Sequence, residues 1–521
     1  MDRRNFITKT ILTSGALATT GLLQACEKYS GTPNNKRSAD FKPDIEFNLI
    51  SEPGKVNIFS NNPTEVYKYN FKLIKGNSYN IQGIKNSYLG PIIRVKKGQK
   101  IRVNYKNLLD EESIIHWHGL HIPEEMDGHP RFVIDKGEDY VYEFKIMNRA
   151  GTYWFHPHPH GKTGPQVYGG LAGLFIVSDD EEESLNLPKG KYDIPIVIQD
   201  RIFNSDNQLV YLQSPMQKMN GFLGNQILIN GRPNFNLSVS SKAYRLRLLN
   251  GSNSRIYKIA LSNGTPLKVI GNDGGLFEKP ITKNYIVLAP AERIDMIVDF
   301  SGMELNSKVE LISLPFPNPN MGGGMMMGRM AGSSGLPNGA QLKLAEFNIN
   351  KIVNEPFKLP GKLSNIPQID TSNAINLNNP RRFRFAMSRM SWTINGKTFG
   401  MTDVASDEKV KLNTSEIWEF INGGGSMGMG MMGGMIQMPH PVHIHQLQFR
   451  IIERSFNNSS LWQSLKDGFI DEGWKDTFLL LPGMKVKILI SFKDYPGLFL
   501  YHCHNLEHED MGMMRNYLIS S

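Results

Sequence analysis

Four His-x-His pairs constrain the fold of this chain more than any other feature of its sequence. Alternate residues of a β-strand point to the same face, so such a pair on a strand presents two imidazoles side by side. Imidazole is the commonest side-chain ligand of transition metals. Four pairs among 13 histidines therefore indicate strands that carry metal ligands. The pairs are His116 with His118, His156 with His158, His443 with His445, and His502 with His504.

The last pair encloses a cysteine, in the stretch "YHCHNLEHEDMGMM". On a strand, the Cys503 thiol points away from the face that carries its two histidine neighbours. Cys503, His508 and an upstream histidine can form a His₂Cys site, and an axial thioether completes the pattern of a blue-copper electron-transfer centre. The spacing C-x₄-H-x₄-M selects Met513 as the axial ligand, with core packing as its alternative role. Met511 and Met514 do not fit this spacing, and we expect them to pack or to face the substrate.

Short runs of strand-forming residues follow one another from about residue 45. "PIIRVKKGQKIRVNYKN" alternates apolar and polar positions, and "YVYEFKI" and "GLAGLFIVSD" are bounded by turn-forming residues. The pattern begins again at "KYDIPIVIQD" and a third time at "RRFRFAMSRMSWTING". Turn signals about every ten residues are typical of β-sandwiches. We therefore predict an all-β chain of three sandwich domains in series, at 45–180, 185–350 and 380–521, with a linker at 351–380.

The N-terminal residues predict export. "MDRRNFITKT" carries Arg3 and Arg4 and is followed by a mildly apolar run and "LLQAC". Residues 1–26 thus resemble a twin-arginine export signal ending in a lipobox, with Cys26 lipidated. Cleavage after Ala18 would instead release a soluble form, and a buried N-terminal helix is the remaining alternative. Because twin-arginine export carries folded proteins, a cofactor-holding chain suits it, and we expect a periplasmic location, with residues 27–44 as a flexible tether.

The overall composition excludes several classes of protein. The net charge of +9 comes from scattered Lys and Arg with no basic stripe of interleaved aromatics, which argues against a nucleic-acid partner. No internal apolar run is long enough to span a bilayer. Only Cys26 and Cys503 are present, so a disulfide framework is excluded.

Two methionine-rich segments interrupt the strand pattern. "MGGGMMMGRM" covers 321–330 and "MGMGMMGGMIQM" covers 427–438, and together they hold 11 of the 25 methionines. Their glycine content makes them poor strands, so we predict loops. Thioethers are soft ligands that select Cu(I). The second segment ends two residues before His440, which would place its thioethers over that histidine.

The four histidine motifs occur in the order found in multicopper oxidases. The chain resembles that family over essentially its whole mature length, and most closely the cuprous-oxidase (copper-efflux oxidase) and bacterial laccase subgroup. The motifs are "HWHG", "WFHPHPHG", "HPVHIH" and "HCHNLEH". The resemblance implies three cupredoxin-like Greek-key domains and four copper ions, held by the first and third domains. It also implies that four one-electron oxidations reduce dioxygen to two waters.

Carried over position by position, the family pattern implies a ligand set for each copper. The type 1 copper would take His440, Cys503 and His508, with Met513 axial. The type 2 copper would take His116 and His443. The type 3 pair would take His118, His156, His158, His445, His502 and His504. His160 is left over and is expected beside the ligands or at the surface, and no family role is assigned to His121 or His129.

Two carboxylates are candidates for proton supply by the same resemblance. Asp127 lies in "EEMDGHP", and Glu509 directly follows His508. Positioned acids and bases of this kind accelerate proton transfer. Ordinary surface carboxylates are the alternative interpretation.

The methionine-rich segments favour Cu(I) as the substrate, as in cuprous-oxidase members of the family. The chain departs from that subgroup at Ile436 and Gln437, where those members often carry an acidic residue before the type 1 histidine. Substrate copper would then be held mainly by thioethers. The candidates are Met427, Met429, Met431, Met432, Met435 and Met438. A laccase-like oxidase of phenols and a copper-binding storage protein are the competing hypotheses, and the segments could also be mere filler. We expect a monomer.

Overall fold

The computed structural model describes residues 37–60, 62–319, 335–388, 390–423, 437–457 and 459–521. The predicted export signal, the start of the tether, the segment 321–330 and most of the segment 427–438 lie outside the described residues. Five of the candidate substrate ligands are among them: Met427, Met429, Met431, Met432 and Met435. In the described part of the chain, no helix is long and apolar enough to cross a membrane.

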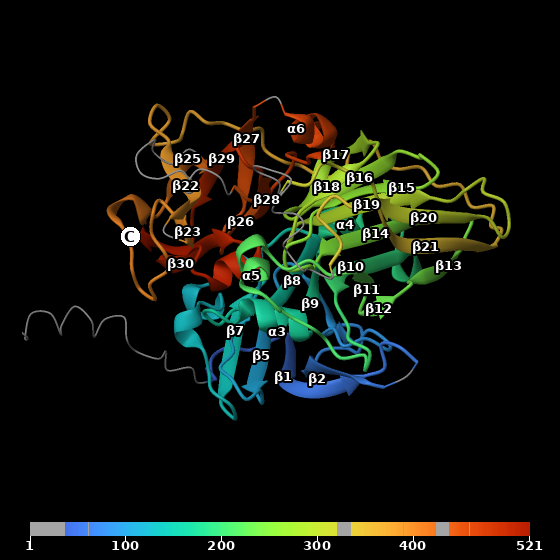
Figure 1. Cartoon of the computed structure of the whole chain (residues 1–521), viewed down its shortest axis with the longest axis horizontal. Helices are drawn as coiled ribbons and strands as arrows, with labels where there is room; N and C mark the ends of the chain where they lie inside the picture. Colours follow the sequence, from blue (N-terminus) through green and yellow to red (C-terminus); the bar gives the residue numbers. More distant parts are fainter. Residues whose placement is uncertain (1–36, 61, 320–334, 389, 424–436, 458) are drawn as a thin grey trace, which may run out of the picture.

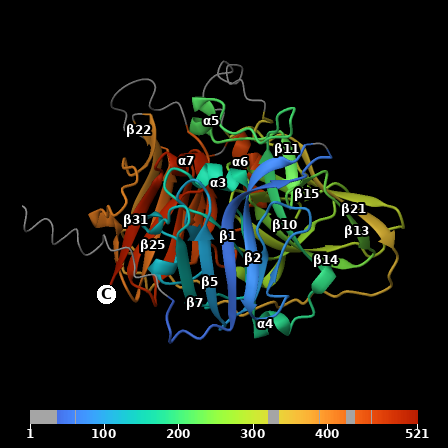
Figure 2. The same ribbon diagram turned by 90° about the horizontal axis from the view of Figure 1, so that it is seen from below.

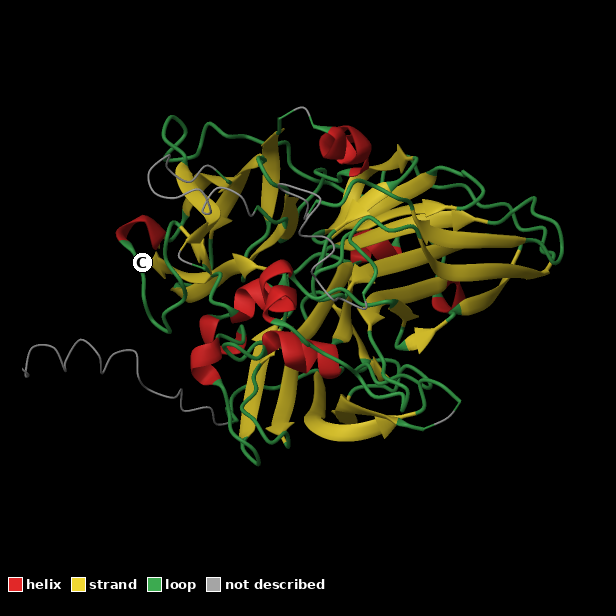
Figure 3. Cartoon of the chain, in the orientation of Figure 1, coloured by secondary structure: helices red, strands yellow, loops and turns green. Residues whose placement is uncertain are grey.

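The predicted all-β class is confirmed. Strands dominate the molecule, with a few short helices at its connections (Figure 3). The strands form six sheets, and these follow the chain as three successive pairs. Each sheet contains one parallel pair among antiparallel neighbours, for example β1 with β5 and β22 with β25. This repeated arrangement gives the three sheet pairs a common topology.

The first sheet pair is built from residues 45–178. One sheet has the order β2 (Thr64–Lys75), β1 (Ile45–Val56), β5 (Lys100–Asn107), β7 (Asp139–Lys145). The other has the order β3 (Ile81–Gln82), β4 (Ile92–Lys96), β9 (Gly173–Ser178), β8 (Gly151–Pro157), β6 (Ile115–His116). Buried residues alternate along β7, and along β5 except at the buried Arg102, which is the period of two expected of half-buried strands.

The second sheet pair is built from residues 193–351. Its larger sheet has the order β12 (Arg232–Pro233), β11 (Gln226–Ile229), β10 (Asp193–Arg201), β14 (Ala243–Asn250), β19 (Arg293–Asp299), β16 (Leu267–Asn272), β17 (Gly275–Lys283). The smaller has the order β13 (Asn236–Ser240), β21 (Leu342–Lys351), β20 (Lys308–Ser313), β15 (Tyr257–Leu261), β18 (Ile286–Leu288). β14 is buried along its whole length because sheet neighbours and the first sheet pair cover it.

The third sheet pair is built from residues 381–520. One sheet has the order β23 (Ser391–Ile394), β22 (Arg381–Ser388), β25 (Thr414–Asn422), β29 (Lys485–Phe492), β27 (Phe449–Ser455). The other has the order β24 (Lys409–Lys411), β31 (Met514–Ser520), β30 (Gly497–Cys503), β26 (His440–Ile444), β28 (Thr477–Leu480). The short helices are α3 (Thr163–Gly169), α4 (Asp180–Glu183), α5 (Pro215–Asn220), α6 (Ser460–Leu465) and α7 (Leu506–Asp510), with 3-10 turns at Glu124–Met126, Pro130–Phe132, Gly190–Tyr192, Ser406–Glu408 and Lys466–Gly468.

Each sheet pair encloses its own apolar core, and a further cluster joins the first two pairs. That joining cluster includes Trp154 and Leu174 from the first pair and Val197 and Leu249 from the second. The first and third pairs also lie against each other (Figures 1 and 2). At this contact both oxygens of Asp510 accept backbone N–H groups at the start of α3, each at 2.9 Å. The three sheet pairs therefore form one packed body in which the first pair contacts the third.

Candidate metal centres

Two neighbouring strands, β26 and β30, carry potential ligands on both of their faces. His443 pairs in register with His502, and Val442 pairs with Cys503. Because strand residues alternate between faces, His440 shares the face of Cys503, while His443 shares the face of His502. The sheet therefore separates two groups of ligands by the thickness of one backbone.

Three donor atoms converge on the Cys503 face. The Nδ1 atom of His440 lies 3.3 Å from the Cys503 sulfur and 3.3 Å from the Nδ1 atom of His508. The sulfur lies 3.7 Å from His508 Nδ1. All three side chains are buried. One thiol and two imidazoles in this arrangement match the His₂Cys set that holds blue copper.

The chain returns to Cys503 through a tight helical turn. The Asn505 side chain accepts the His508 N–H at the start of α7, as helix-capping residues do. Gly512 then takes a φ of 94°, which only glycine adopts without strain, and ends the helix. The Cys503 N–H donates to the Met513 carbonyl at 3.0 Å. Met513 is thereby held, fully buried, beside the cysteine.

Residues that the sequence did not single out cover this group. The Met219 carbonyl on α5 accepts hydrogen bonds from His508 Nε2 and from the Trp392 indole, both at 3.0 Å. The Trp392 ring lies 4.5 Å from the His508 ring, centroid to centroid. His508 is therefore screened from solvent by a helix of the second sheet pair and by a tryptophan.

Eight histidines converge on the other face, where the first and third sheet pairs meet. Donor atoms within 4.8 Å of one another form three groups: His116, His118 and His443; His118, His156 and His504; and His158, His445 and His502. The predicted His-x-His pairs are thus brought together from four distant parts of the sequence. Each outer sheet pair contributes four of the rings.

Hydrogen bonds fix which ring nitrogen faces the centre of this cluster. The Nδ1 atom of His116 lies 2.6 Å from the Asp127 carbonyl, and that of His443 lies 2.8 Å from the Asp476 carbonyl. His156 Nδ1 lies 2.9 Å from the Pro157 carbonyl. A carbonyl accepts only from N–H, so these rings carry hydrogen on Nδ1 and leave the Nε2 lone pair free for a metal.

Unpartnered buried nitrogens show that the cluster fits a metal ion. His118 Nδ1, His156 Nε2 and both ring nitrogens of His504 have no hydrogen-bond partner among the described residues, although all are buried. An unsatisfied buried polar atom costs about 1–3 kcal/mol. Three buried imidazoles with unpartnered nitrogens in one cluster are therefore better explained as metal ligands than as residues that only stabilise the fold.

Burial also sets the protonation of these groups. It lowers the pKa of His156 to about 4, of His158 to about 3 and of His508 to about 3. The rings are neutral near pH 7, so their lone pairs are available to a metal. Burial raises the pKa of the Cys503 thiol well above its ordinary value. A bound cation must therefore displace the thiol proton.

The two predicted proton-supply carboxylates both contact the cluster. Asp127 Oδ2 lies 2.7 Å from His445 Nδ1, and burial, with Glu124 nearby, raises its pKa well above the ordinary value. Glu509 Oε2 lies 3.1 Å from His502 Nδ1. Burial alone would raise the Glu509 pKa, but His502 and His158 outweigh it and lower the pKa to about 2.

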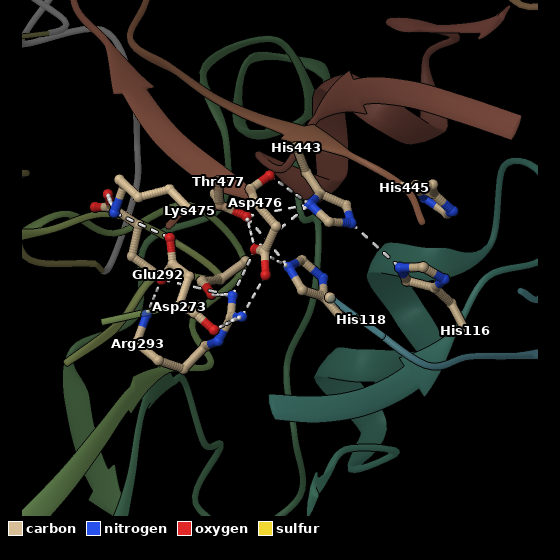
Figure 4. A network of polar contacts seen from close by, with 12 residues as sticks. His116, His118, Asp273, Glu292, Arg293, His443, His445, Lys475, Asp476 and Thr477 are labelled. Carbon is tan, nitrogen blue, oxygen red and sulfur yellow. Dashed lines mark hydrogen bonds and ion pairs between the residues drawn. The ribbon is translucent and has the colours of Figure 1, made fainter. Parts of the chain in front are cut away.

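A third carboxylate, which the sequence analysis missed, contacts the cluster at His118 (Figure 4). Asp476 Oδ1 lies 3.1 Å from His118 Nε2, and Arg293 of the second sheet pair donates to the same carboxylate. Asp476 precedes the apolar strand β28 in "WKDTFLLL". A charged pair directly before a buried strand could have drawn attention to Asp476, whereas no local signal marks Arg293.

The remaining histidines lie outside the cluster. His160 is exposed and packs on Phe399. His129 Nε2 lies 2.9 Å from the Asn516 side-chain oxygen, and His121 Nε2 lies 2.9 Å from Asp494. His121 and His129 therefore tie the first sheet pair to the third.

Met438, expected to bind substrate copper, is only 1% exposed and belongs to the core of the third sheet pair. Its burial favours packing over contact with an ion from solvent. Met511 packs against the same core and Met514 is buried, so their place in the structure is that of packing residues.

Comparison with known proteins agrees with this geometry. Models of multicopper oxidase domains match residues 65–182, 193–306 and 374–521. The McoA multicopper oxidase of Aquifex aeolicus is 35% identical, with a TM-score of 0.76, covering 92% of this chain and 97% of that one. A laccase of Pediococcus acidilactici is 31% identical, with a TM-score of 0.73 and 92% coverage of both chains. A Campylobacter jejuni multicopper oxidase, described as a metallo-oxidase, is 26% identical, with a TM-score of 0.72 and 93% coverage of both.

The fold and the histidine clusters define a copper-binding redox protein built from cupredoxin-like β-sandwiches, as predicted. The chain belongs to the multicopper oxidase family. It is accordingly an oxidoreductase that uses copper and takes dioxygen as its electron acceptor.

Proposed function

We propose that this oxidase uses four copper ions to couple the oxidation of Cu(I) to Cu(II) with the reduction of dioxygen to two waters, and so confers copper tolerance. The observation that carries the proposal is the two-faced arrangement of β26 and β30, with the His₂Cys group on one face and eight imidazoles on the other. Bound copper supplies the one-electron redox chemistry and the reduction of dioxygen.

The proposed ligand sets are those implied by the family pattern, and the grouping of the donor atoms supports them. His440, Cys503 and His508, with Met513 axial, would hold the type 1 copper. The type 2 copper would take His116 and His443. The type 3 pair would take His118, His156 and His504 on one side and His158, His445 and His502 on the other.

The chain provides the connection between the two faces. Cys503 is bonded through the backbone to His502 and His504, which makes this the shortest covalent path from the type 1 ligands to the cluster. Asp127 and Glu509 would supply protons, because each carboxylate lies against a histidine of the proposed ligand set.

Cu(I) is the proposed reductant for two reasons. The methionine-rich segments provide soft thioethers in the sequence next to His440. In addition, His508 is fully buried and its Nε2 atom is hydrogen-bonded to the Met219 carbonyl, so an aromatic substrate cannot stack directly on this proposed ligand. The metallo-oxidase activity ascribed to the Campylobacter relative is consistent with this choice.

Oxygen consumption by the copper-loaded chain from residue 27 onward tests the proposal. We expect fast uptake with Cu(I) and slow uptake with a simple phenol. Fast uptake with the phenol alone would establish the second candidate, a laccase-like oxidase, which the relative from Pediococcus and the complete ligand set favour. Copper binding without uptake from either reductant would leave a copper-storage protein.

The cellular setting is part of the same proposal. The paired arginines and the "LLQAC" stretch support export to the periplasm in the folded state, with a lipid anchor at Cys26. We propose a monomer. Fractionation of cells expressing the full chain and its Cys26→Ser variant tests the anchor, since only the unaltered chain should be found with membranes.

A further inference from the structure

We propose that Arg293, a residue of the second sheet pair, positions the trinuclear copper cluster by holding the carboxylate of Asp476 against His118. The second sheet pair contributes none of the proposed copper ligands, so this role connects it to the reaction centre. The inference rests on the proposed ligand set, in which His118 binds one copper of the type 3 pair.

Arg293 is fully buried, and each of its five N–H donors has an acceptor. Nη1 and Nη2 donate to the two oxygens of Asp476, the first at 2.7 Å. Nη1 also donates to the Ala291 carbonyl, at 2.9 Å, and Nη2 to the Asp273 carbonyl, at 3.1 Å. Nε donates to the carbonyl of Thr152 on β8, at 3.0 Å. Among side chains, only a guanidinium can donate to both oxygens of one carboxylate and to three carbonyls at the same time.

The position of Arg293 joins all three sheet pairs. Its own strand β19 belongs to the second pair, Thr152 to the first and Asp476 to the third. β8, which holds Thr152, also carries His156. A shift of the guanidinium would therefore disturb the cluster from two directions.

Asp476 is the residue through which Arg293 acts. Its Oδ1 atom lies 3.1 Å from His118 Nε2, and its backbone carbonyl lies 2.8 Å from His443 Nδ1. The Thr477 hydroxyl donates to the same Oδ1 atom at 2.9 Å and also lies 3.1 Å from His118 Nε2. A carboxylate held in this way accepts the hydrogen of His118 Nε2.

This hydrogen bond decides which nitrogen of His118 can bind copper. With hydrogen on Nε2, the lone pair lies on Nδ1, the buried nitrogen that has no partner among the described residues. His116, His156 and His443 instead have Nδ1 against backbone carbonyls, which are fixed by the fold itself. The tautomer of His118 depends on a side chain, and that side chain depends on Arg293.

The surrounding charges keep this pair in place. Lys475 Nζ lies 2.9 Å from Asp273 and 3.2 Å from Glu292, so two cations face three carboxylates in a buried network (Figure 4). Gly119, directly after His118, has a φ of 84°. A Cβ at this glycine would lie 3.0 Å from the Arg293 guanidinium and closer still to Asp476. The backbone that follows the ligand is therefore packed directly on the ion pair.

The test compares two Arg→Lys variants of the full copper-loaded chain. In Arg293→Lys the positive charge remains, but one ammonium cannot replace the fork and the carbonyl contacts. We expect trinuclear copper to bind about 10- to 100-fold more weakly, as is usual when a partner of a ligand is lost. The type 2 EPR signal should change or weaken, while the blue absorption of the type 1 site stays.

Arg245→Lys is the matched control. Arg245 is also buried in the same sheet, and its Nε and Nη2 atoms both donate to Asp295, with Glu182 as a further partner, but this ion pair includes no histidine. We expect this variant to keep its full copper content and both spectral signatures. Equal copper loss in the two variants would mean that general damage to the second sheet pair is responsible, and would overturn the proposal, as would an unchanged cluster in Arg293→Lys.

Two further measurements apply if Arg293→Lys does not fold. In Asp476→Asn the side-chain oxygen must face Arg293 and the amide NH₂ must face His118. The His118 ring then carries its hydrogen on Nδ1 instead of Nε2, so we expect the same selective loss of trinuclear copper. Unchanged copper binding in this variant would contradict the proposal. In the fully reduced holoenzyme, which is diamagnetic, ¹⁵N NMR should show His118 with hydrogen on Nε2. Hydrogen on Nδ1 would exclude the inference. Failure of the unaltered chain to bind trinuclear copper would instead contradict the proposed function.

Discussion

The Nδ1 atom of His445 lies 2.7 Å from Oδ2 of Asp127, although 318 residues separate them in the sequence. The backbone carbonyl of Asp127 lies 2.6 Å from His116 Nδ1. One residue of the first sheet pair thus orients a histidine of its own pair and a histidine of the third. The histidine cluster is therefore held across the contact between the outer sheet pairs by residues outside the proposed ligand set.

The Asp127→Asn substitution should therefore slow dioxygen reduction. It keeps the shape of the side chain but removes the carboxyl group that exchanges a proton beside His445. Loss of such a partner typically costs about 10- to 100-fold in activity. Oxygen uptake should fall by the same factor with Cu(I) and with a phenol, because both reductants deliver their electrons at the type 1 site and the substitution affects the later step at the cluster. A loss confined to one reductant would contradict a role at the cluster.

The Cys503→Ser substitution should separate the two copper-binding faces. A serine hydroxyl cannot replace the soft thiolate, so the blue absorption and all oxygen uptake should disappear. The eight imidazoles lie on the opposite face of β30, so the cluster copper should remain and total copper should fall by one ion per chain. Metal analysis with EPR checks this, and loss of the cluster copper as well would show that the two sites are not independent.

Removal of residues 427–436 tests whether the methionine-rich segment selects the substrate. If the segment both binds Cu(I) and keeps bulky phenols away from the type 1 site, its removal should lower Cu(I) oxidation and raise phenol oxidation. Met438→Leu is the control, because Met438 is buried and Leu and Met differ little in volume. That variant should keep the KM for Cu(I). An unchanged ratio of Cu(I) oxidation to phenol oxidation after the deletion would show that the segment has no part in substrate selection.

Much of the architecture could be predicted because its signals are local. The period-two pattern of β5 and the spacing around Cys503 require no knowledge of distant residues. The role of Arg293 could not be predicted, since its partners Thr152 and Asp476 are far away in the chain and come together only when three sheet pairs pack. The contact between His508 and the Met219 carbonyl could not be predicted either, because a backbone carbonyl is present in every residue type.

The same distinction applies to Met438. Its membership of a methionine-rich segment suggested a ligand, but Met438 lies two residues before β26 and is buried in the core of the third sheet pair. Composition assigned one role to the whole segment, whereas the burial of Met438 assigns this residue to the core.

Acid stability should depend on a buried ion pair in the second sheet pair. Asp193 contacts Arg247 at 2.7 and 3.0 Å, next to Arg245, Arg94 and Glu182. Burial alone would raise the Asp193 pKa, but Arg247 and Arg245 outweigh it, so the pKa lies below its ordinary value. A carboxyl group with a depressed folded-state pKa stabilises the fold above its unfolded pKa of about 3.9, and this contribution is lost as the pH falls further.

The Asp193→Asn variant lacks the titrating carboxyl group, so its stability should depend less on pH in the acid range. At pH 7 the variant leaves Arg247 without one of its charge partners and should unfold at a lower temperature, since breaking a buried pair costs about 3 kcal/mol. Between pH 5 and pH 3, on either side of the ordinary carboxyl pKa of about 3.9, its apparent Tm should fall less steeply than that of the unaltered chain. Thermal unfolding followed by circular dichroism provides the comparison, and parallel pH profiles would show that this pair does not contribute to acid lability.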